Sequence, residues 1–179
     1  MRDDLTLRGL NRTLLERQYL LGRSAMGALD AVDHLVGLQA QEPNWPFVGL
    51  WTRLQEFRPD DLNSLLASGQ VVRSAGLRST QHLLTAKDLS WLRTTLQPVM
   101  DRAARSPYLT RTTTGLDTAD LAASVRELLS TGPMTRRALA KSLAALWPPR
   151  NGRILAGAGE LAVPLVHGLS TSLGSMGHR

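Results

Sequence analysis

The chain has 179 residues, a formal net charge of +6 and no cysteine. The missing cysteines exclude a disulfide-stapled secreted scaffold, a thiol nucleophile and a cysteine zinc site. No run of about 18 apolar residues is present to span a membrane, and the amino terminus lacks the apolar segment of a signal peptide. The sequence therefore predicts a globular cytoplasmic protein with no membrane partner.

The positive charge is concentrated in the second half of the chain. Residues 1–90 carry ten basic and ten acidic side chains, whereas residues 91–179 carry eleven and five. Residues 132–153 contain five basic side chains and no acidic one, which is the charge pattern of a surface that binds a polyanion. The five are Arg136, Arg137, Lys141, Arg150 and Arg153.

Apolar residues at helical spacing predict four helices in the first 70 residues. The first helix contains Leu10 and ends at Gly22, and the second takes Ser24 as its N-cap. The third and fourth helices begin at Pro46 and Pro59, because proline suits the first helical turn.

A hairpin is predicted next, with short strands at residues 71–73 and 77–83. A long helix over residues 86–104 follows it, with apolar residues at helical spacing. Helices followed by a short hairpin are typical of a winged helix-turn-helix. The sequence therefore predicts a first winged-helix domain over residues 1–105.

The rest of the chain predicts a second helical domain. Residues 106–116 are Thr-rich and polar, which favours a linker. Within residues 117–167, a first helix, a tight turn, a basic helix capped by Thr135 and a third helix over residues 154–163 follow one another. This order is that of a helix-turn-helix. Residues 168–179 are rich in Gly and Ser and are predicted to form a disordered tail.

Five ordered segments carry a more specific pattern. They are Leu-Asn-Arg at 10–12, Gly-Leu-Gln-Ala-Gln-Glu-Pro-Asn at 37–44, Gly-Leu-Trp-Thr-Arg-Leu at 49–54, residues 78–88, and Gly-Pro-Met-Thr at 132–135 before the basic helix. Together they resemble the AlkZ-like winged-helix DNA glycosylases over residues 7–167. The resemblance implies a mainly α protein with short β-hairpin wings, built as tandem winged helix-turn-helix domains that need no metal or cofactor.

The resemblance also implies an activity and a length. It implies a monofunctional glycosylase that acts in DNA repair as a monomer, removing alkylated purines, crosslinked ones included, from double-stranded DNA. Proteins of this kind are about twice as long as this chain. The sequence is therefore interpreted as a C-terminally truncated member whose second winged-helix domain is incomplete.

The family's Gln-hydrophobic-Gln motif, which orients the attacking water, matches Gln39 and Gln41 with Ala40 between them. Side chains at positions i and i+2 of a helix point apart, so the two glutamines converge on one water only if the backbone leaves helical geometry here. Gly37 and Pro43 bracket the segment and favour that departure. Glu42 is the one adjacent carboxylate and is kept as a secondary candidate for a base.

Two further sets of residues are candidates for DNA contact. Trp45 follows the glutamine pair and is predicted to stack on a base, whereas Trp51, Trp91 and Trp147 are predicted to lie in the core. The five basic residues of 132–153 are predicted to bind phosphates. The alternative to an enzyme is a DNA-binding module without catalysis, as in a transcription regulator or a degenerate fragment. The Gln39-Ala40-Gln41 motif favours the enzyme, because a regulator does not need it.

Overall fold

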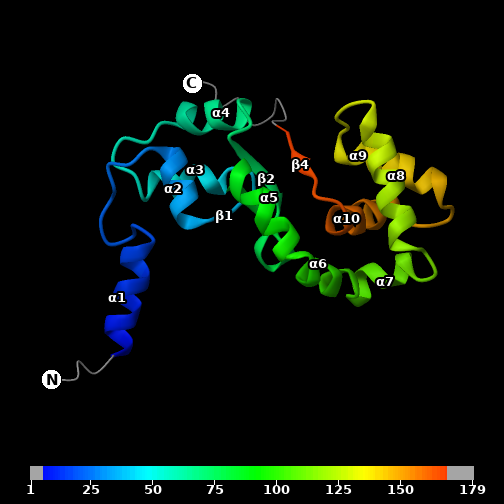
Figure 1. Cartoon of the computed structure of the whole chain (residues 1–179), viewed down its shortest axis with the longest axis horizontal. Coiled ribbons are helices and arrows are strands. Elements are labelled where there is room, and N and C mark those ends of the chain that lie inside the picture. Colours follow the sequence, from blue (N-terminus) through cyan, green and yellow to red (C-terminus); the bar gives the residue numbers. More distant parts are fainter. Residues whose placement is uncertain (1–5, 169–179) are drawn as a thin grey trace. The chain divides into compact units, whose positions relative to one another are not determined.

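A computed structural model describes residues 6–168, in which helices predominate over a small antiparallel sheet (Figure 1). The chain divides into two compact units. Of the described residues, unit 1 comprises 6–73 and 82–88, and unit 2 comprises 74–81 and 89–168. The prediction of a mainly helical fold with short strands is confirmed. No helix within residues 6–168 is long and apolar enough to cross a membrane.

Unit 1 contains the four predicted helices, with corrected ends. α1 stops well before Gly22, and α2 is capped by Gly27 rather than by Ser24. The Ser24 cap prediction is wrong because Ser24 forms a β-bridge with Leu54, and its backbone amide donates to the carbonyl of Arg53. The helical elements of unit 1 are α1 (Leu7–Arg17), α2 (Ala28–Leu35), α3 (Trp45–Trp51) and α4 (Pro59–Ala67).

The strands are short, and the central two form the predicted hairpin. They are β2 (Val71–Ala75) and β3 (Gln81–Thr85), and each is divided between the two units. In unit 1, β1 (Leu38–Gln39) pairs antiparallel with β3, so that Leu38 lies opposite Leu83 and Gln39 opposite His82. The core of unit 1 joins this sheet to α2, α3 and α4 through buried residues that include Val32, Leu38, Leu50, Leu62, Val71 and Leu83.

The single helix predicted over residues 86–104 is two helices in the structure. α5 (Ala86–Thr95) ends just before Leu96, which is the N-cap of α6 (Gln97–Ala104). Pro98 explains the break, because proline is accepted in the first turn of a helix and not in its interior.

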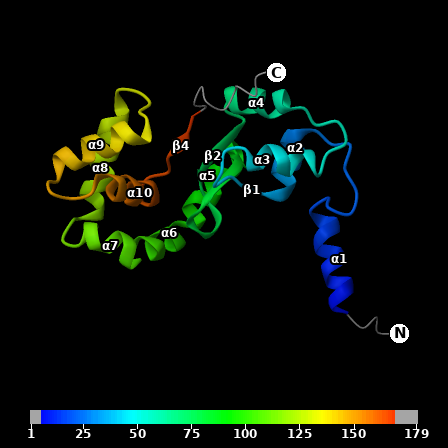
Figure 2. The ribbon, with the colours of Figure 1, turned by 180° about the vertical axis from the view of Figure 1, so that it is seen from behind.

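Unit 2 is organised around α10 (Gly152–Ala162), which packs against α6, α7 (Pro107–Thr113), α8 (Thr118–Ser130) and α9 (Arg136–Leu146). α9 and α10 lie side by side in both views of the ribbon (Figures 1 and 2). β4 (Val166–His167) is the neighbour of β2, and the Ser74 hydroxyl donates to the Leu165 carbonyl at 2.6 Å. Met100, Leu121, Val125, Leu143 and Leu155 are among the buried core residues.

Residues 106–116, predicted to be a linker, contain α7 in the structure. Its Leu109 is buried in the core of unit 2, which anchors the segment there rather than leaving it as a spacer. The compact units divide around β2 and β3 instead. The predicted tail lies outside the described residues from residue 169 onward.

Candidate functional site

Gln39 and Gln41 lie on a short non-helical segment that follows α2. Val36, just after the helix, has a left-handed backbone with φ of 62°, which turns the chain out of helical geometry. Leu38 and Ala40 are buried in the core of unit 1, whereas the two glutamines are exposed. Gln39 is the last residue of β1, and Gln41 lies in the bend that follows the strand. The departure from helical geometry expected at this motif is therefore present.

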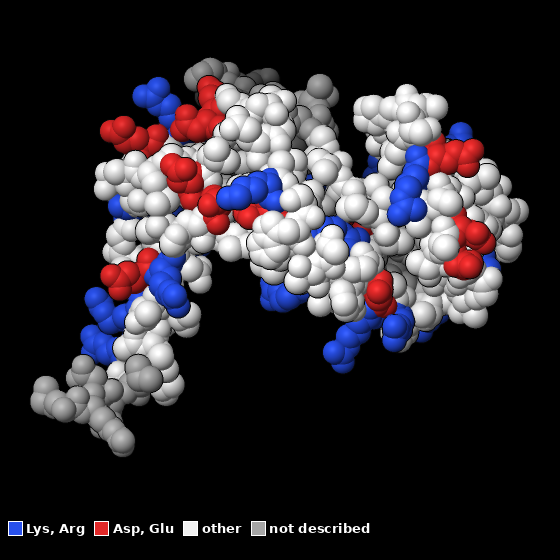
Figure 3. Space-filling view, in the orientation of Figure 1, with Lys and Arg blue, Asp and Glu red and all other residues white. Residues whose placement is uncertain are grey.

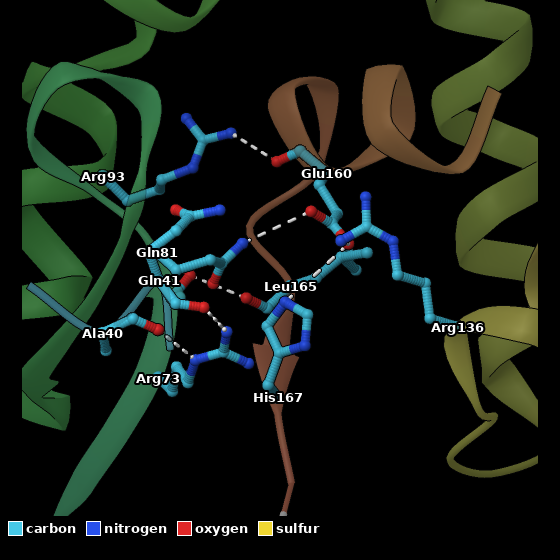
Figure 4. A network of polar contacts seen from close by, with 10 residues as sticks. Ala40, Gln41, Arg73, Gln81, Arg93, Arg136, Glu160, Leu165 and His167 are labelled. Atoms are coloured by element: carbon cyan, nitrogen blue, oxygen red, sulfur yellow. Dashed lines mark hydrogen bonds and ion pairs between the residues drawn. The ribbon is translucent and has the colours of Figure 1, made fainter. Parts of the chain in front are cut away.

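The backbone between the glutamines is held by Arg73 from β2 (Figure 4). Its Nε donates to the carbonyl of Ala40 at 2.7 Å, and its Nη2 donates to the carbonyl of Gln41 at 3.2 Å. Hydrogen bonds from a charged donor are stronger than neutral ones, and the planar guanidinium fixes two acceptors at once. Arg73 therefore sets the position of the segment that carries the glutamine pair.

The approach of the chain to β1 also requires a glycine. A Cβ at Gly37 would lie 2.8 Å from Cδ2 of Leu84, closer than real Cβ atoms approach a neighbour. Gly37 thus lets the chain pass directly over β3 on its way from α2 to the glutamines.

The tryptophans do not follow the expected division between core and surface. Trp45 is exposed at the start of α3, as its predicted role requires, and Trp147 packs half-buried against the core of unit 2. The core prediction is wrong for Trp51 and Trp91, which are 55% and 50% exposed. α3 buries only Pro46 and Leu50 among its seven residues, and its Trp45, Val48 and Trp51 side chains are exposed. The guanidinium of Arg23 lies 4.6 Å above the ring of Trp51, in cation–π geometry.

The five basic residues predicted to bind phosphate fall into two groups. Arg136 forms an ion pair with Glu160 at 3.2 Å, and Arg150 donates to the carbonyls of Thr112 and Thr114. These two guanidinium groups are engaged inside unit 2. Arg137, Lys141 and Arg153 are exposed and line one groove of about 750 Å³.

Sequence reasoning missed the buried carboxylate of Glu160 on α10. Besides Arg136, it accepts a hydrogen bond from the side-chain amide of Gln81 at 3.3 Å and lies 3.8 Å from Nε2 of His167 (Figure 4). Glu160 is the only charged residue of the otherwise apolar helix segment 154–162. This isolation is a sequence signal that could have predicted an internal partner for the carboxylate. Arg136 and Arg137 are both exposed, and the ion pair with Glu160 distinguishes Arg136 from its neighbour.

Arg93 is a second buried charge near the end of α10. Its Nη2 donates to the carbonyl of Leu161 at 2.6 Å, and its Nη1 donates to the side chain of Gln97 at 2.5 Å. Burial lowers the pKa of the Arg93 guanidinium, and the nearby charge of Asp101 opposes that shift. Arg93 thus ties α5 to the carboxyl end of α10 and leaves no phosphate-binding role for its buried head.

Charge is distributed differently over the surfaces of the two units (Figure 3). Over α1, positive and negative side chains are interspersed on the face drawn. Over α6 and α7, positive side chains predominate along the edge drawn. In the sequence of this region, Arg102, Arg105 and Arg111 are exposed. The excess charge of the second half therefore reaches the surface of unit 2 at more places than the basic helix alone.

The family model for DNA glycosylase AlkZ-like proteins matches residues 32–174. The match covers most of the chain and includes the glutamine pair and the basic groove, so the chain belongs to the AlkZ-like DNA glycosylase family. No curated protein shows significant sequence similarity to it.

A solved structure supports the fold. The structure of Streptomyces sahachiroi DNA glycosylase AlkZ is similar to this chain with a TM-score of 0.68 at 22% sequence identity. The similarity covers 88% of this chain and 45% of the AlkZ chain. The chain thus spans less than half of the length of that protein, and the shared fold extends over both units described here.

Proposed function

We propose that this chain binds double-stranded DNA and hydrolyses the N-glycosidic bond of N7-alkylated purines as a monofunctional glycosylase. The observation that carries the proposal is the exposure of Gln39 and Gln41 on a non-helical segment whose Ala40 and Gln41 carbonyls are held by Arg73, in a chain of the AlkZ-like family. An N7-alkylated purine is already cationic. It therefore leaves as a neutral base without help from a strong general acid.

The proposed role of the glutamines is to position water. The water oxygen bonds to C1′ of the sugar while the C1′–N9 bond breaks, and the electron pair of that bond neutralises the departing purine. The sugar passes through an oxocarbenium-like state, as in other glycosyl hydrolysis, and the water proton goes to solvent. A glutamine side chain does not titrate, but its carbonyl accepts a hydrogen bond and its amide donates two. Gln39 and Gln41 thus aim the water by position rather than by proton transfer.

The proposal extends to the fold and to the DNA contacts. We interpret α2, α3, α4 and the β2–β3 hairpin as a first winged helix, and α8, α9 and α10 as the helices of a second one. In this arrangement Trp45 stacks on a base, and Arg137, Lys141 and Arg153 bind phosphates. The internal contacts of Arg136 and Arg150 support positioning roles for them instead.

The test is release of N7-methylguanine from methylated duplex DNA by the purified chain. We expect release above the spontaneous rate for the wild type and none for the double variant Gln39→Ala/Gln41→Ala. Gln70→Ala is the matched control, because Gln70 is an exposed glutamine of unit 1 outside the motif, and it should keep the wild-type rate. A wild type that releases no base above buffer overturns the enzymatic proposal.

A second candidate is a DNA-binding module without catalysis. The observation that favours it is the groove lined by Arg137, Lys141 and Arg153, since phosphate contacts alone give duplex binding without any catalytic group. Salt-dependent duplex binding without base release would establish this alternative.

A further inference from the structure

The groove beside α9 is built from three separate elements of unit 2. Its lining residues come from α7, from α9, and from the first turn of α10 with its N-cap. Its volume of about 750 Å³ is in the range of sites that hold ligands. It is lined by Tyr108, Arg136, Arg137, Ala140, Lys141, Ala144, Asn151, Gly152 and Arg153.

Three exposed cations face this groove without an acidic residue among its lining. Arg137 and Lys141 are four positions apart on α9, so they lie one turn apart on one helix face. Arg153 comes from the first turn of α10. Arg136 lines the same groove, but its guanidinium is paired with Glu160. The three remaining charges suit a ligand with several separated negative groups, as in a phosphodiester chain.

The start of α10 is fixed against α9 by an unusually close approach. A Cβ at Gly152 would lie 1.9 Å from the carbonyl oxygen of Ala140, so only glycine allows the two helices to meet here. Asn151 caps α10 by accepting hydrogen bonds from the backbone amides of Arg153 and Ile154. The start of α10 is therefore fixed, and the backbone that carries Arg153 is held in place.

Tyr108 is the aromatic residue of this groove, and it is 68% exposed. Tyrosine hydroxyls are frequent donors to DNA phosphates. We infer that the groove binds the sugar–phosphate backbone of one DNA strand, with Arg137, Lys141 and Arg153 at successive phosphates and the Tyr108 hydroxyl donating to a phosphate oxygen. This inference rests on the proposed DNA binding and adds Tyr108 and the path of one strand to it.

The first test is the salt dependence of binding to a fluorescein-labelled, undamaged DNA duplex, measured by anisotropy. Removing three phosphate contacts in Arg137→Ala/Lys141→Ala/Arg153→Ala should reduce the slope of log K against log salt by about 3. Arg126→Ala is the control, because Arg126 is exposed on α8 of the same unit outside the groove. It should leave the slope unchanged. A triple variant that keeps the wild-type slope overturns the inference while leaving DNA binding intact, whereas a wild type that binds no duplex overturns both proposals.

The second test isolates the tyrosine. Tyr108→Phe removes only the hydroxyl and should weaken duplex binding about two- to tenfold, with no change in the salt slope because no charge is lost. Tyr19→Phe is the matched control in unit 1 and should bind as the wild type does. Full affinity in Tyr108→Phe, even if Tyr108→Ala binds weakly, overturns the assignment of the hydroxyl to a phosphate.

Discussion

Arg73 of unit 1 and the groove arginines of unit 2 are used in opposite ways. In unit 1, Arg73 turns its guanidinium onto the carbonyls of Ala40 and Gln41, so the surface beside it presents neutral amides. In unit 2, Arg137 and Arg153 extend into an open groove. The contrast shows that a positively charged side chain indicates a binding surface only where it is not already hydrogen-bonded or paired within the protein. The proposed chemistry belongs to unit 1, and the proposed phosphate contacts with DNA belong to unit 2.

The largest effect is expected from Arg73→Ala. Loss of both hydrogen bonds frees the backbone at Gln41, and a displacement of about 1 Å at a reacting centre costs roughly 100-fold in rate. We expect base release to fall by about that factor while duplex affinity stays unchanged, because Arg73 lies outside the basic groove. The two readouts are single-turnover release of N7-methylguanine and anisotropy on an undamaged duplex.

Arg12→Ala supplies the matched control, because Arg12 is an exposed arginine of α1 in the same unit. It should retain both activities. Arg73→Lys sharpens the test further, since lysine keeps the charge but lacks the planar fork that reaches two carbonyls. Full release in the lysine variant would show that charge alone, and not the two fixed hydrogen bonds, supports the glutamine segment.

The sequence predicted well wherever local signals decide the structure. The predicted cap of α9 is confirmed, because the Thr135 hydroxyl accepts from the backbone amide of Ala138. Ser24 carried the same cap signal and failed, because bonding to residues 53–55 competes for its backbone. A local cap signal is therefore sufficient to predict the start of a helix only where the backbone at that position forms no hydrogen bonds with a distant segment.

The site was predictable in its residues but not in its contacts. The need for the backbone to leave helical geometry at Gln39 and Gln41 followed from the spacing of the motif. The Arg73 hydrogen bonds join residues 32 and 33 positions apart, and Glu160 lies 24 residues beyond Arg136. Only the fold brings such pairs together. For the same reason, the sequence predicted the same phosphate-binding role for all five basic residues of 132–153. In the structure, Arg136 and Arg150 have partners within unit 2.

A stability difference of about 1–3 kcal/mol is expected from Gly152→Ala, because overpacking a tight contact forces the backbone to shift. The added methyl would overlap the Ala140 carbonyl and push α10 away from α9. Gly157→Ala in the same helix is the control, since its Cβ meets only a guanidinium nitrogen of Arg136 at 3.6 Å. It should stabilise unit 2 by about 0.5–1 kcal/mol through helix propensity. Denaturant unfolding measures both changes, and equal effects would contradict the close approach at Gly152.

A smaller loss of about 1 kcal/mol is expected from Thr135→Ala, which removes the N-cap of α9. Because α9 carries two of the groove cations, fraying of its first turn should affect Arg137 before Lys141. Hydrogen exchange at the first backbone amides of α9 would detect the fraying. Thr131→Ala is the comparison, because Thr131 follows α8 and provides no side-chain cap; it should leave exchange in α9 unchanged.

The smallest and sharpest test compares two neighbours, Arg136→Ala and Arg137→Ala. Both remove one positive charge from the same turn of α9, so a diffuse electrostatic surface would respond equally to either. Arg137→Ala should lower the salt slope of duplex binding by about 1, the value for one lost phosphate contact. Arg136→Ala should keep that slope and instead cost about 1 kcal/mol or less of stability, because it breaks a partly exposed ion pair. If the two variants lower the slope equally, Arg136 leaves Glu160 for DNA, and the division between structural and DNA-binding arginines in unit 2 is wrong.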